Sequence, residues 1–233
     1  MGKVTACLCI HGFTGSPMEV EPLADYIKHY TNWECVIPTL PGHGNELNLK
    51  GIIYNEWLQH AEEALQDLLD RHETVYVIGF SMGGLIASYL ATKYPIKKLI
   101  LLSAAAYYIN FVQLQRDIRI ICADFFRGRI RENEQFIRYM NKIKRTPLAA
   151  AIQFRKLVQY VKPHLSNIHV PTLIAQGEKD GIVPLKSASY LYHTIRAENK
   201  KIIYVEESKH LICHCEKREP LFQEIITFLD EPS

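Results

Sequence analysis

The chain has 233 residues, of which 48% are hydrophobic and 22% are charged, and its formal net charge is +2. This length can bury a large core, and the composition is typical of a globular protein and unlike that of a disordered one. The small net charge and the lack of any zinc-finger spacing give no support to nucleic-acid binding.

The first ten residues, MGKVTACLCI, run directly into a stretch that is typical of a strand. Their apolar part is too short for a signal peptide, no small-residue cleavage site follows, and Ala6 does not fit the myristoylation pattern. No apolar run in the sequence reaches the length of a membrane span. We therefore expect a cytoplasmic protein without stable membrane insertion.

Short β-branched and apolar runs alternate along the chain with segments whose apolar residues recur at helical spacing. Strands are predicted near residues 4–10, 34–38, 74–80, 97–103, 171–176 and 200–205. Helices are predicted near residues 18–30, 55–72, 82–94, 185–196 and 219–229. This alternation predicts an α/β fold with a mostly parallel sheet and helices on both faces, in which ligands bind beyond the carboxyl ends of the strands.

The first predicted strand ends in the glycine-bearing turn HGFTGS, residues 11–16. Neither G-x-G-x-x-G nor a Walker A lysine is present, so the turn favours a backbone N–H that faces an oxyanion over a phosphate cradle. On this interpretation the N–H of Phe13 is one donor. The turn PGHG, residues 41–44, follows the second strand, and we expect its glycines to serve the backbone conformation alone.

Ser81 lies between the apolar run VYVI, residues 75–78, and a helical pattern that ends before Pro95. Residues 79–83 read GFSMG and match G-x-S-x-G in its required strand-to-helix context, the nucleophile elbow. We therefore expect Ser81 to be a nucleophile and the N–H of Met82, the next residue, to be the second oxyanion donor.

A serine nucleophile needs a histidine base and a carboxylate that holds the base in the correct tautomer. GEKDGIVP follows the fifth predicted strand and EESKH follows the sixth, so the acid and the base come in the order Ser, Asp, His. Asp180 is favoured as the acid over Glu178, which lies nearer the strand end. His210 is favoured as the base over His214, which lies toward the last helix.

The six cysteines are few for this length, and in a reducing compartment we expect buried thiols that behave as small hydrophobic side chains. They are Cys7, Cys9, Cys35, Cys122, Cys213 and Cys215. The cluster His210, Cys213, His214 and Cys215 is an alternative metal site, but its spacing is too tight for structural zinc and lacks a second ligand pair. We predict no metal and no organic cofactor.

Together these motifs resemble the α/β-hydrolases, in particular the bacterial carboxylesterase and monoacylglycerol lipase branch. HGFTGS, PGHG with Trp57 downstream, GFSMGG, GEKDGIVP and SKH occur in the order of that family across nearly the whole chain. Ser81, Asp180 and His210 match its triad, and Phe13 and Met82 match its oxyanion positions. Lys209 replaces a glycine common in relatives and places a long cation beside the histidine.

About sixty residues separate the fourth strand from the fifth, which is too long for a plain connection. With the resemblance, this predicts a core of residues 1–106 and 167–233 and a helical cap of residues 107–166. The cap holds twelve Lys and Arg against four Asp and Glu; solvated helix faces explain this balance, and attraction of anionic substrates or membrane surfaces is the alternative.

Apolar residues are interspersed through the cap and either seat it on the core or line an acyl pocket. They are Phe111, Val112, Leu114, Ile118, Ile121, Phe125, Phe126, Phe136, Ile137, Met140, Leu148, Phe154 and Leu157.

The sequence therefore predicts a serine carboxylic-ester hydrolase that acts through an acyl-enzyme on short- to medium-chain acyl esters or monoacylglycerols. The same triad also serves thioester and carbon–carbon bond hydrolysis in relatives, and a non-catalytic binding protein on this fold is a further alternative. The expected partner is a small, lipid-like ester, and no motif indicates an oligomeric state.

Overall fold

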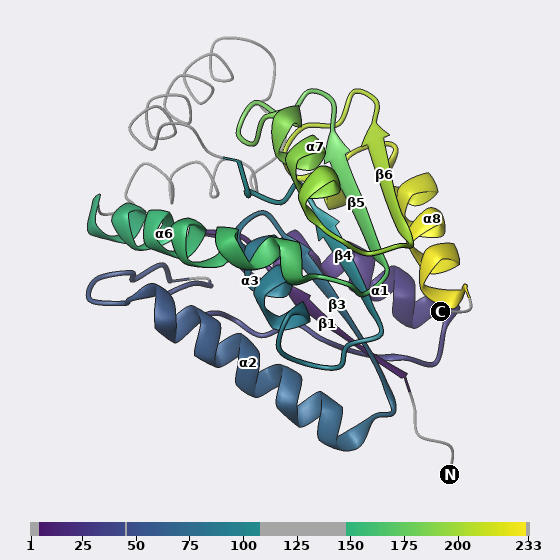
Figure 1. Cartoon of the computed structure of the whole chain (residues 1–233), viewed down its shortest axis with the longest axis horizontal. Coiled ribbons are helices and arrows are strands. Elements are labelled where there is room, and N and C mark those ends of the chain that lie inside the picture. Colours follow the sequence, from purple (N-terminus) through teal and green to yellow (C-terminus); the bar gives the residue numbers. More distant parts are fainter. Residues whose placement is uncertain (1–4, 45, 108–147, 232–233) are drawn as a thin grey trace.

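A single parallel sheet forms the centre of the molecule in the computed structural model, which describes residues 5–44, 46–107 and 148–231 (Figure 1). The six strands are β1 (Thr5–Ile10), β2 (Glu34–Val36), β3 (Thr74–Phe80), β4 (Lys98–Leu102), β5 (Thr172–Gly177) and β6 (Lys200–Val205). Their order is β2-β1-β3-β4-β5-β6, and all neighbouring pairs are parallel. All six strands predicted from the sequence are confirmed.

Helices cover both faces of the sheet (Figure 1). The described α-helices are α1 (Glu21–Tyr30), α2 (Tyr54–Arg71), α3 (Met82–Ala91), α6 (Leu148–Val161), α7 (Leu185–Thr194) and α8 (Arg218–Asp230). Short 3-10 helices are η1 (Pro17–Glu19), η2 (Lys162–Asn167) and η3 (Ile212–His214). The helix predicted over 18–30 is divided between η1 and α1, and Pro22 lies in the first turn of α1, where its missing N–H costs nothing.

Two apolar clusters lie on opposite faces of the sheet because side chains alternate along each buried strand. One cluster joins the sheet to α2, α3, α6 and α7, and the other joins it to α1 and α8. In the part of the chain that the structure describes, no helix combines the length and the apolar character needed to cross a membrane.

Lys98 is a buried cation on the central strand β4, with 1% of its surface exposed. Its Nζ atom donates to the carbonyl of Phe228 at 2.7 Å and to that of Glu231, and it lies 5.2 Å from the centre of the Phe228 ring. Burial lowers the pKa of Lys98. The contacts satisfy carbonyls at the carboxyl end of α8, where cations are favourable, and tie that helix to the sheet.

Candidate functional site

Ser81 occupies the turn between β3 and α3. Its backbone has φ 53° and ψ −114°, which is costly for a residue with a side chain. Its N–H donates to the carbonyl of Leu102 at 2.9 Å. A Cβ atom on Gly79 would lie 2.3 Å from the carbonyl oxygen of Gly83, and one on Gly83 would lie 2.2 Å from that of Ile10. Only glycine therefore fits at positions 79 and 83.

Ser81, His210 and Asp180 form one chain of hydrogen bonds. The Oγ atom of Ser81 lies 3.1 Å from Nε2 of His210, and Nδ1 of His210 lies 2.8 Å from Oδ2 of Asp180. The side chain of His210 is 6% exposed and that of Asp180 is fully buried. Because the carboxylate only accepts, Nδ1 carries the proton and leaves Nε2 free to accept from the serine hydroxyl. In this arrangement a histidine can take the proton of a serine nucleophile.

The carboxylate of Asp180 is held by donors on both of its oxygens. Oδ1 accepts from the N–H groups of Ile182 and Val183 at 2.8 and 2.9 Å, and Oδ2 also accepts from Nε2 of Gln176 at 2.8 Å. Burial raises the pKa of Asp180, but the charge and hydrogen bond of His210 and the two backbone N–H groups outweigh it, so this pKa is lower than usual. The carboxylate therefore stays ionised beside the imidazole.

Gln176 was not singled out by the sequence analysis. It lies in the buried strand β5 with no exposed surface, and its Nε2 donates to the carbonyl of Val183 at 3.2 Å as well as to Asp180. A polar residue inside the apolar strand TLIAQG was the signal that could have identified it, since buried amides need partners.

The two alternative site residues lie apart from this chain of hydrogen bonds. Glu178 is exposed, and His214 is exposed and donates from Nε2 to the carbonyl of Met18 at 2.8 Å. Lys209 is exposed next to His210, as expected of a long cation at this position. The geometry therefore brings together the favoured acid and base and neither alternative.

Phe13 lies in the turn after β1, and Met82 begins α3 just beyond the end of the neighbouring strand β3. Met82 is the first residue of α3, so no carbonyl of the helix accepts from its N–H. The two turns touch, because the backbone of Gly83 packs against the carbonyls of Ile10 and His11. Both N–H groups are thus close to the same edge of the sheet as Ser81.

The turn at residues 41–44 has the backbone that was expected of its glycines. Gly42 has φ 76° and Gly44 has φ 100°, both in the region that favours glycine. The turn also supports the one at residues 11–16: Gly44 N–H donates to the carbonyl of Gly15 at 3.2 Å, and Leu40 N–H donates to Nε2 of His11 at 3.1 Å. The structural interpretation of PGHG is confirmed.

The side chain of Phe13 lies among aromatic rings from distant segments. It stacks on Phe154 of α6, with centroids 5.1 Å apart and planes at 14°, and meets Trp57 edge-on at 5.8 Å. Phe154 and Leu157 are buried in the core cluster, whereas Leu148 is 63% exposed. Phe154 and Leu157 therefore seat α6 on the core. The remaining apolar residues named for the cap, and most of its basic ones, lie at 108–147, outside the described residues.

The described cysteines are free thiols. Cys7, Cys9 and Cys213 are buried, Cys35 and Cys215 are half-buried, and Cys122 lies outside the described residues. Burial strongly raises the pKa of Cys213. Across residues 5–44, 46–107 and 148–231, no three His, Cys, Asp or Glu side chains are grouped so that they could hold a metal ion.

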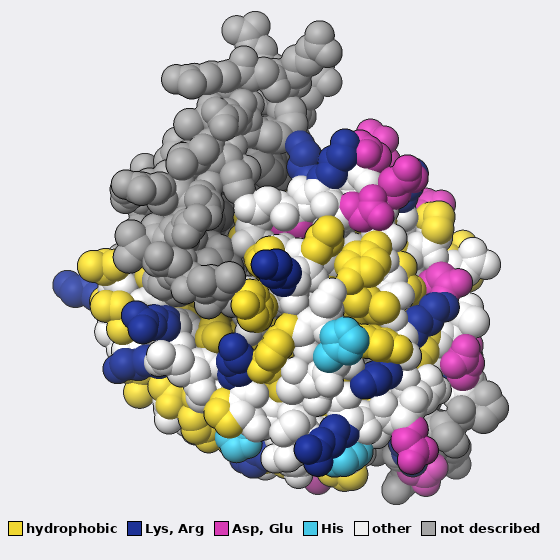
Figure 2. Space-filling model, turned by 45° about the horizontal axis from the view of Figure 1, so that its top comes forward, with side chains coloured by type: hydrophobic (Ala, Val, Ile, Leu, Met, Phe, Trp, Pro, Cys, Tyr) yellow, Lys and Arg dark blue, Asp and Glu magenta, His cyan; other side chains and the backbone are white. Residues whose placement is uncertain are grey.

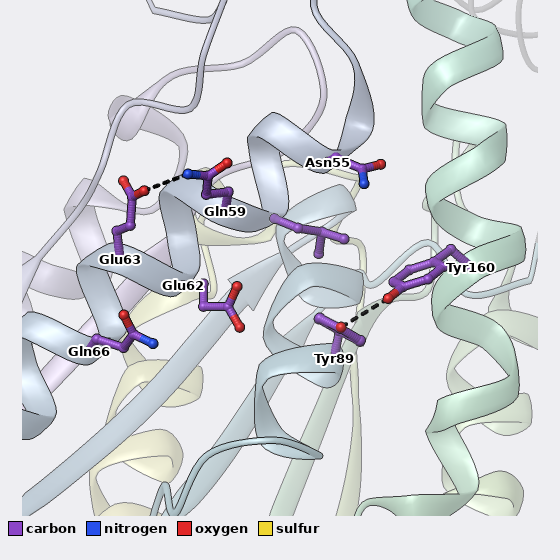
Figure 3. A pocket seen from close by; sticks show the side chains of 8 residues that line it. Asn55, Gln59, Glu62, Glu63, Gln66, Tyr89 and Tyr160 are labelled. Atoms are coloured by element: carbon purple, nitrogen blue, oxygen red, sulfur yellow. Dashed lines mark hydrogen bonds between the residues drawn. The ribbon is translucent and has the colours of Figure 1, made fainter.

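A polar groove of about 480 Å³ lies between α2, α3 and α6 (Figure 3). Its lining residues are Asn55, Leu58, Gln59, Glu62, Glu63, Gln66, Tyr89 and Tyr160. Several of its polar groups bond to each other, such as Gln59 to Glu63 at 2.9 Å and Tyr89 to Tyr160 at 3.0 Å. None of Ser81, Asp180 and His210 lines this groove, so it is separate from their hydrogen-bonded chain.

Comparison with known proteins agrees with the fold. A profile of the family described as serine aminopeptidase, S33, matches residues 3–217. The chain is 29% identical over 221 residues to a thermostable monoacylglycerol lipase from Bacillus sp. (strain H-257), covering 88% of this chain and 82% of that one. It is 24% identical over 234 residues to a carboxylesterase from Bacillus subtilis (strain 168), covering 99% and 94% of the two chains.

The solved structure of an esterase from Exiguobacterium antarcticum has the same fold, with a TM-score of 0.75, 22% identity and coverage of 99% of this chain and 94% of that one. The chain thus belongs to the family that its profile identifies, within the α/β-hydrolases. It is a carboxylic ester hydrolase of the carboxylesterase and monoacylglycerol lipase type.

Proposed function

We propose that the chain hydrolyses short- to medium-chain acyl esters or monoacylglycerols through an acyl-enzyme on Ser81. The observation that carries this proposal is the chain of hydrogen bonds from Ser81 through His210 to Asp180. The similarity to a monoacylglycerol lipase and to a carboxylesterase supports the substrate class.

In the first half of the reaction the Ser81 oxygen attacks the acyl carbon while Nε2 of His210 takes its proton. The carbonyl oxygen then carries negative charge, which the N–H groups of Phe13 and Met82 stabilise. His210 returns the proton to the leaving alcohol, and the carbon–oxygen bond of the ester breaks. Asp180 stabilises the imidazolium and keeps its proton on Nδ1.

In the second half a water molecule takes the place of the alcohol. His210 removes a proton from the water as it attacks the acyl-enzyme, and then gives that proton back to Ser81 as the acid leaves. No step requires a metal or an organic cofactor.

We propose that residues 107–166 form the cap and select the acyl chain, on a core of residues 1–106 and 167–233. The triad and the oxyanion donors contact only the ester group of the substrate. The rest of the acyl chain therefore needs apolar surface elsewhere in the protein. Each buried methylene contributes about 0.8 kcal/mol, so specificity should rise with acyl length until the pocket is full. Phe154 lies in the core cluster and anchors α6, so it is not among the residues proposed to line the pocket.

The test combines labelling with a substrate panel. A fluorophosphonate should label wild-type protein on Ser81 and leave Ser81→Ala unlabelled, and a non-catalytic binding protein would not be labelled. Turnover of matched esters, thioesters and amides of graded acyl length should be fastest with esters. Faster turnover of thioesters or amides, or of a carbon–carbon bond substrate, would overturn the ester assignment, and a flat response to acyl length would overturn the cap proposal.

A further inference from the structure

A buried carboxylate lies directly behind the turn that carries Phe13. Glu19 is the last residue of η1 and is only 5% exposed. Its Oε2 atom accepts from the N–H of Gly12 at 2.7 Å, at the short end of the range for such bonds. A carboxylate is rarely buried this far unless its contacts are specific.

The turn lies so close to this carboxylate that a side chain fits at position 15 only if the carboxylate moves. A Cβ atom on Gly15 would lie 2.0 Å from Oε2 of Glu19 and 2.5 Å from Oε1, while one on Gly12 would lie 3.1 Å from Oε2. Gly15 does not have a positive φ, so the demand for glycine comes from the space that Glu19 occupies. The carboxylate of Glu19 therefore fills the space inside the turn that residues 12–15 form.

Glu19 holds the peptide group between His11 and Gly12, and the side chain of His11 holds the next one, between Gly12 and Phe13. The carbonyl of Gly12 accepts from Nδ1 of His11 at 2.9 Å, and Nε2 of His11 accepts from Leu40 at 3.1 Å, so the ring is neutral with its proton on Nδ1. Because a peptide group is planar, the direction of the Gly12 carbonyl determines that of the Phe13 N–H. Glu19 and His11 thus fix both sides of Gly12, the residue that sets the direction of the Phe13 N–H.

We propose that Glu19 is a positioning residue that aims the Phe13 N–H at the oxyanion. This inference rests on the proposed function, since it assigns a purpose to the geometry only if an oxyanion forms there. Without the carboxylate, Gly12 loses its acceptor and the turn loses the group that fills it. Loss of one oxyanion donor lowers kcat by about 100- to 1,000-fold, so a displaced donor should lower it by about 10- to 100-fold.

The first experiment compares Glu19→Ala with Glu19→Gln, which keeps an oxygen that can accept from Gly12. Glu21→Ala is the matched control, because Glu21 is an exposed carboxylate at the start of α1. For a short-chain nitrophenyl ester, Glu19→Ala should lower kcat by about 10- to 100-fold with KM within threefold, because only the transition state uses the donor. Glu19→Gln should recover most of the loss, and Glu21→Ala should match the wild type.

A trifluoromethyl ketone of the same acyl length gives a second readout. The Ser81 oxygen adds to its carbonyl carbon, His210 takes the proton, and the resulting oxyanion occupies the proposed donors. Its inhibition constant should rise in Glu19→Ala by about the factor by which kcat falls. A lower thermal midpoint with unchanged kcat and inhibition constant would show a purely structural role and overturn the proposal, as would Glu19→Gln as slow as Glu19→Ala.

Gly15→Ala tests the same contact from the other side. The added methyl must expel the carboxylate, so this variant should lose about as much kcat as Glu19→Ala. The double variant should lose no more than either single one, because the space is then vacant and the contact is already gone. Multiplying losses, or a Gly15→Ala enzyme like the wild type, would overturn the proposal. Lack of ester turnover in the wild type would instead overturn the proposed function, and the role of Glu19 with it.

Discussion

Replacement of Asp180 by asparagine should lower turnover by several orders of magnitude while leaving the fold largely intact. Each carboxylate oxygen faces two donors: Oδ1 faces the backbone N–H groups of Ile182 and Val183, and Oδ2 faces His210 and Gln176. The new NH₂ group must replace one oxygen and confront two of these donors. The backbone N–H groups cannot adapt, so the NH₂ should lie on the Oδ2 side.

On the Oδ2 side His210 can adapt to the amide, and Gln176 has a second hydrogen bond that is unaffected. His210 can move its proton from Nδ1 to Nε2 and accept from the amide, and Gln176 keeps its bond to the carbonyl of Val183. One weakened buried contact costs about 1–3 kcal/mol of unfolding free energy. A proton on Nε2, however, leaves no base for Ser81, so turnover should fall about 10⁴-fold.

Steady-state ester kinetics and urea unfolding measure the two effects of this change. Glu178→Gln, at an exposed carboxylate in the same loop, is the control and should change neither by much. Because the folded pKa of Asp180 is lowered, its contribution to stability is full above its unfolded pKa of about 4 and is lost as the pH falls through the folded value. The gap in unfolding free energy between wild type and Asp180→Asn should therefore narrow in acid. A turnover loss under tenfold, or an equal loss in Glu178→Gln, would refute the reasoning.

Three further outcomes are expected. Ser81→Ala and His210→Ala should each remove most of kcat, and the double variant should lose no more than either, because the pair acts as a unit; multiplying losses would indicate separate roles. Lys98→Met should lower the unfolding free energy by about 1–3 kcal/mol because the buried carbonyl of Phe228 loses its donor, whereas exposed Lys97→Met should not, as measured in urea. Cys213 should resist thiol reagents in native protein and react after unfolding, since burial raises its pKa; fast native labelling by mass mapping would contradict this.

The strands and the order of the motifs were predictable because they are local patterns. VYVI before GFSMG is a buried strand feeding a glycine turn, and that pattern alone determines where Ser81 lies. Asp180 and His210 follow from the same rule, since each comes in the loop just after a strand. Their separation from Glu178 and His214 rested on distance from the strand end, and the hydrogen bonds agree with that choice.

Contacts between distant segments were not predictable in the same way. Lys98 reads as a surface cation at a strand end, and only the position of α8, 130 residues later, shows why it is buried. Glu19 reads as an ordinary residue near a helix start, because its role depends on how the turn at residues 11–16 folds back. The bounds of the helix α6 could not be predicted within the long insertion. Its anchoring through Phe154 depends on stacking with the distant ring of Phe13.

The spacing of the site residues has a consequence for the folding kinetics. Ser81 and His210 are 129 residues apart, and His210 and Asp180 are 30 apart, and they follow three different strands of an all-parallel sheet. Contacts of such high sequence separation form late, because the chain loses the entropy of closing long loops before these contacts contribute any stabilisation. Regain of turnover after dilution from denaturant should therefore coincide with the slowest phase of refolding, when β6 joins β5. A partly folded chain that already holds the serine turn would still not hydrolyse esters. The rate at which turnover returns therefore reports the rate at which the sheet is completed.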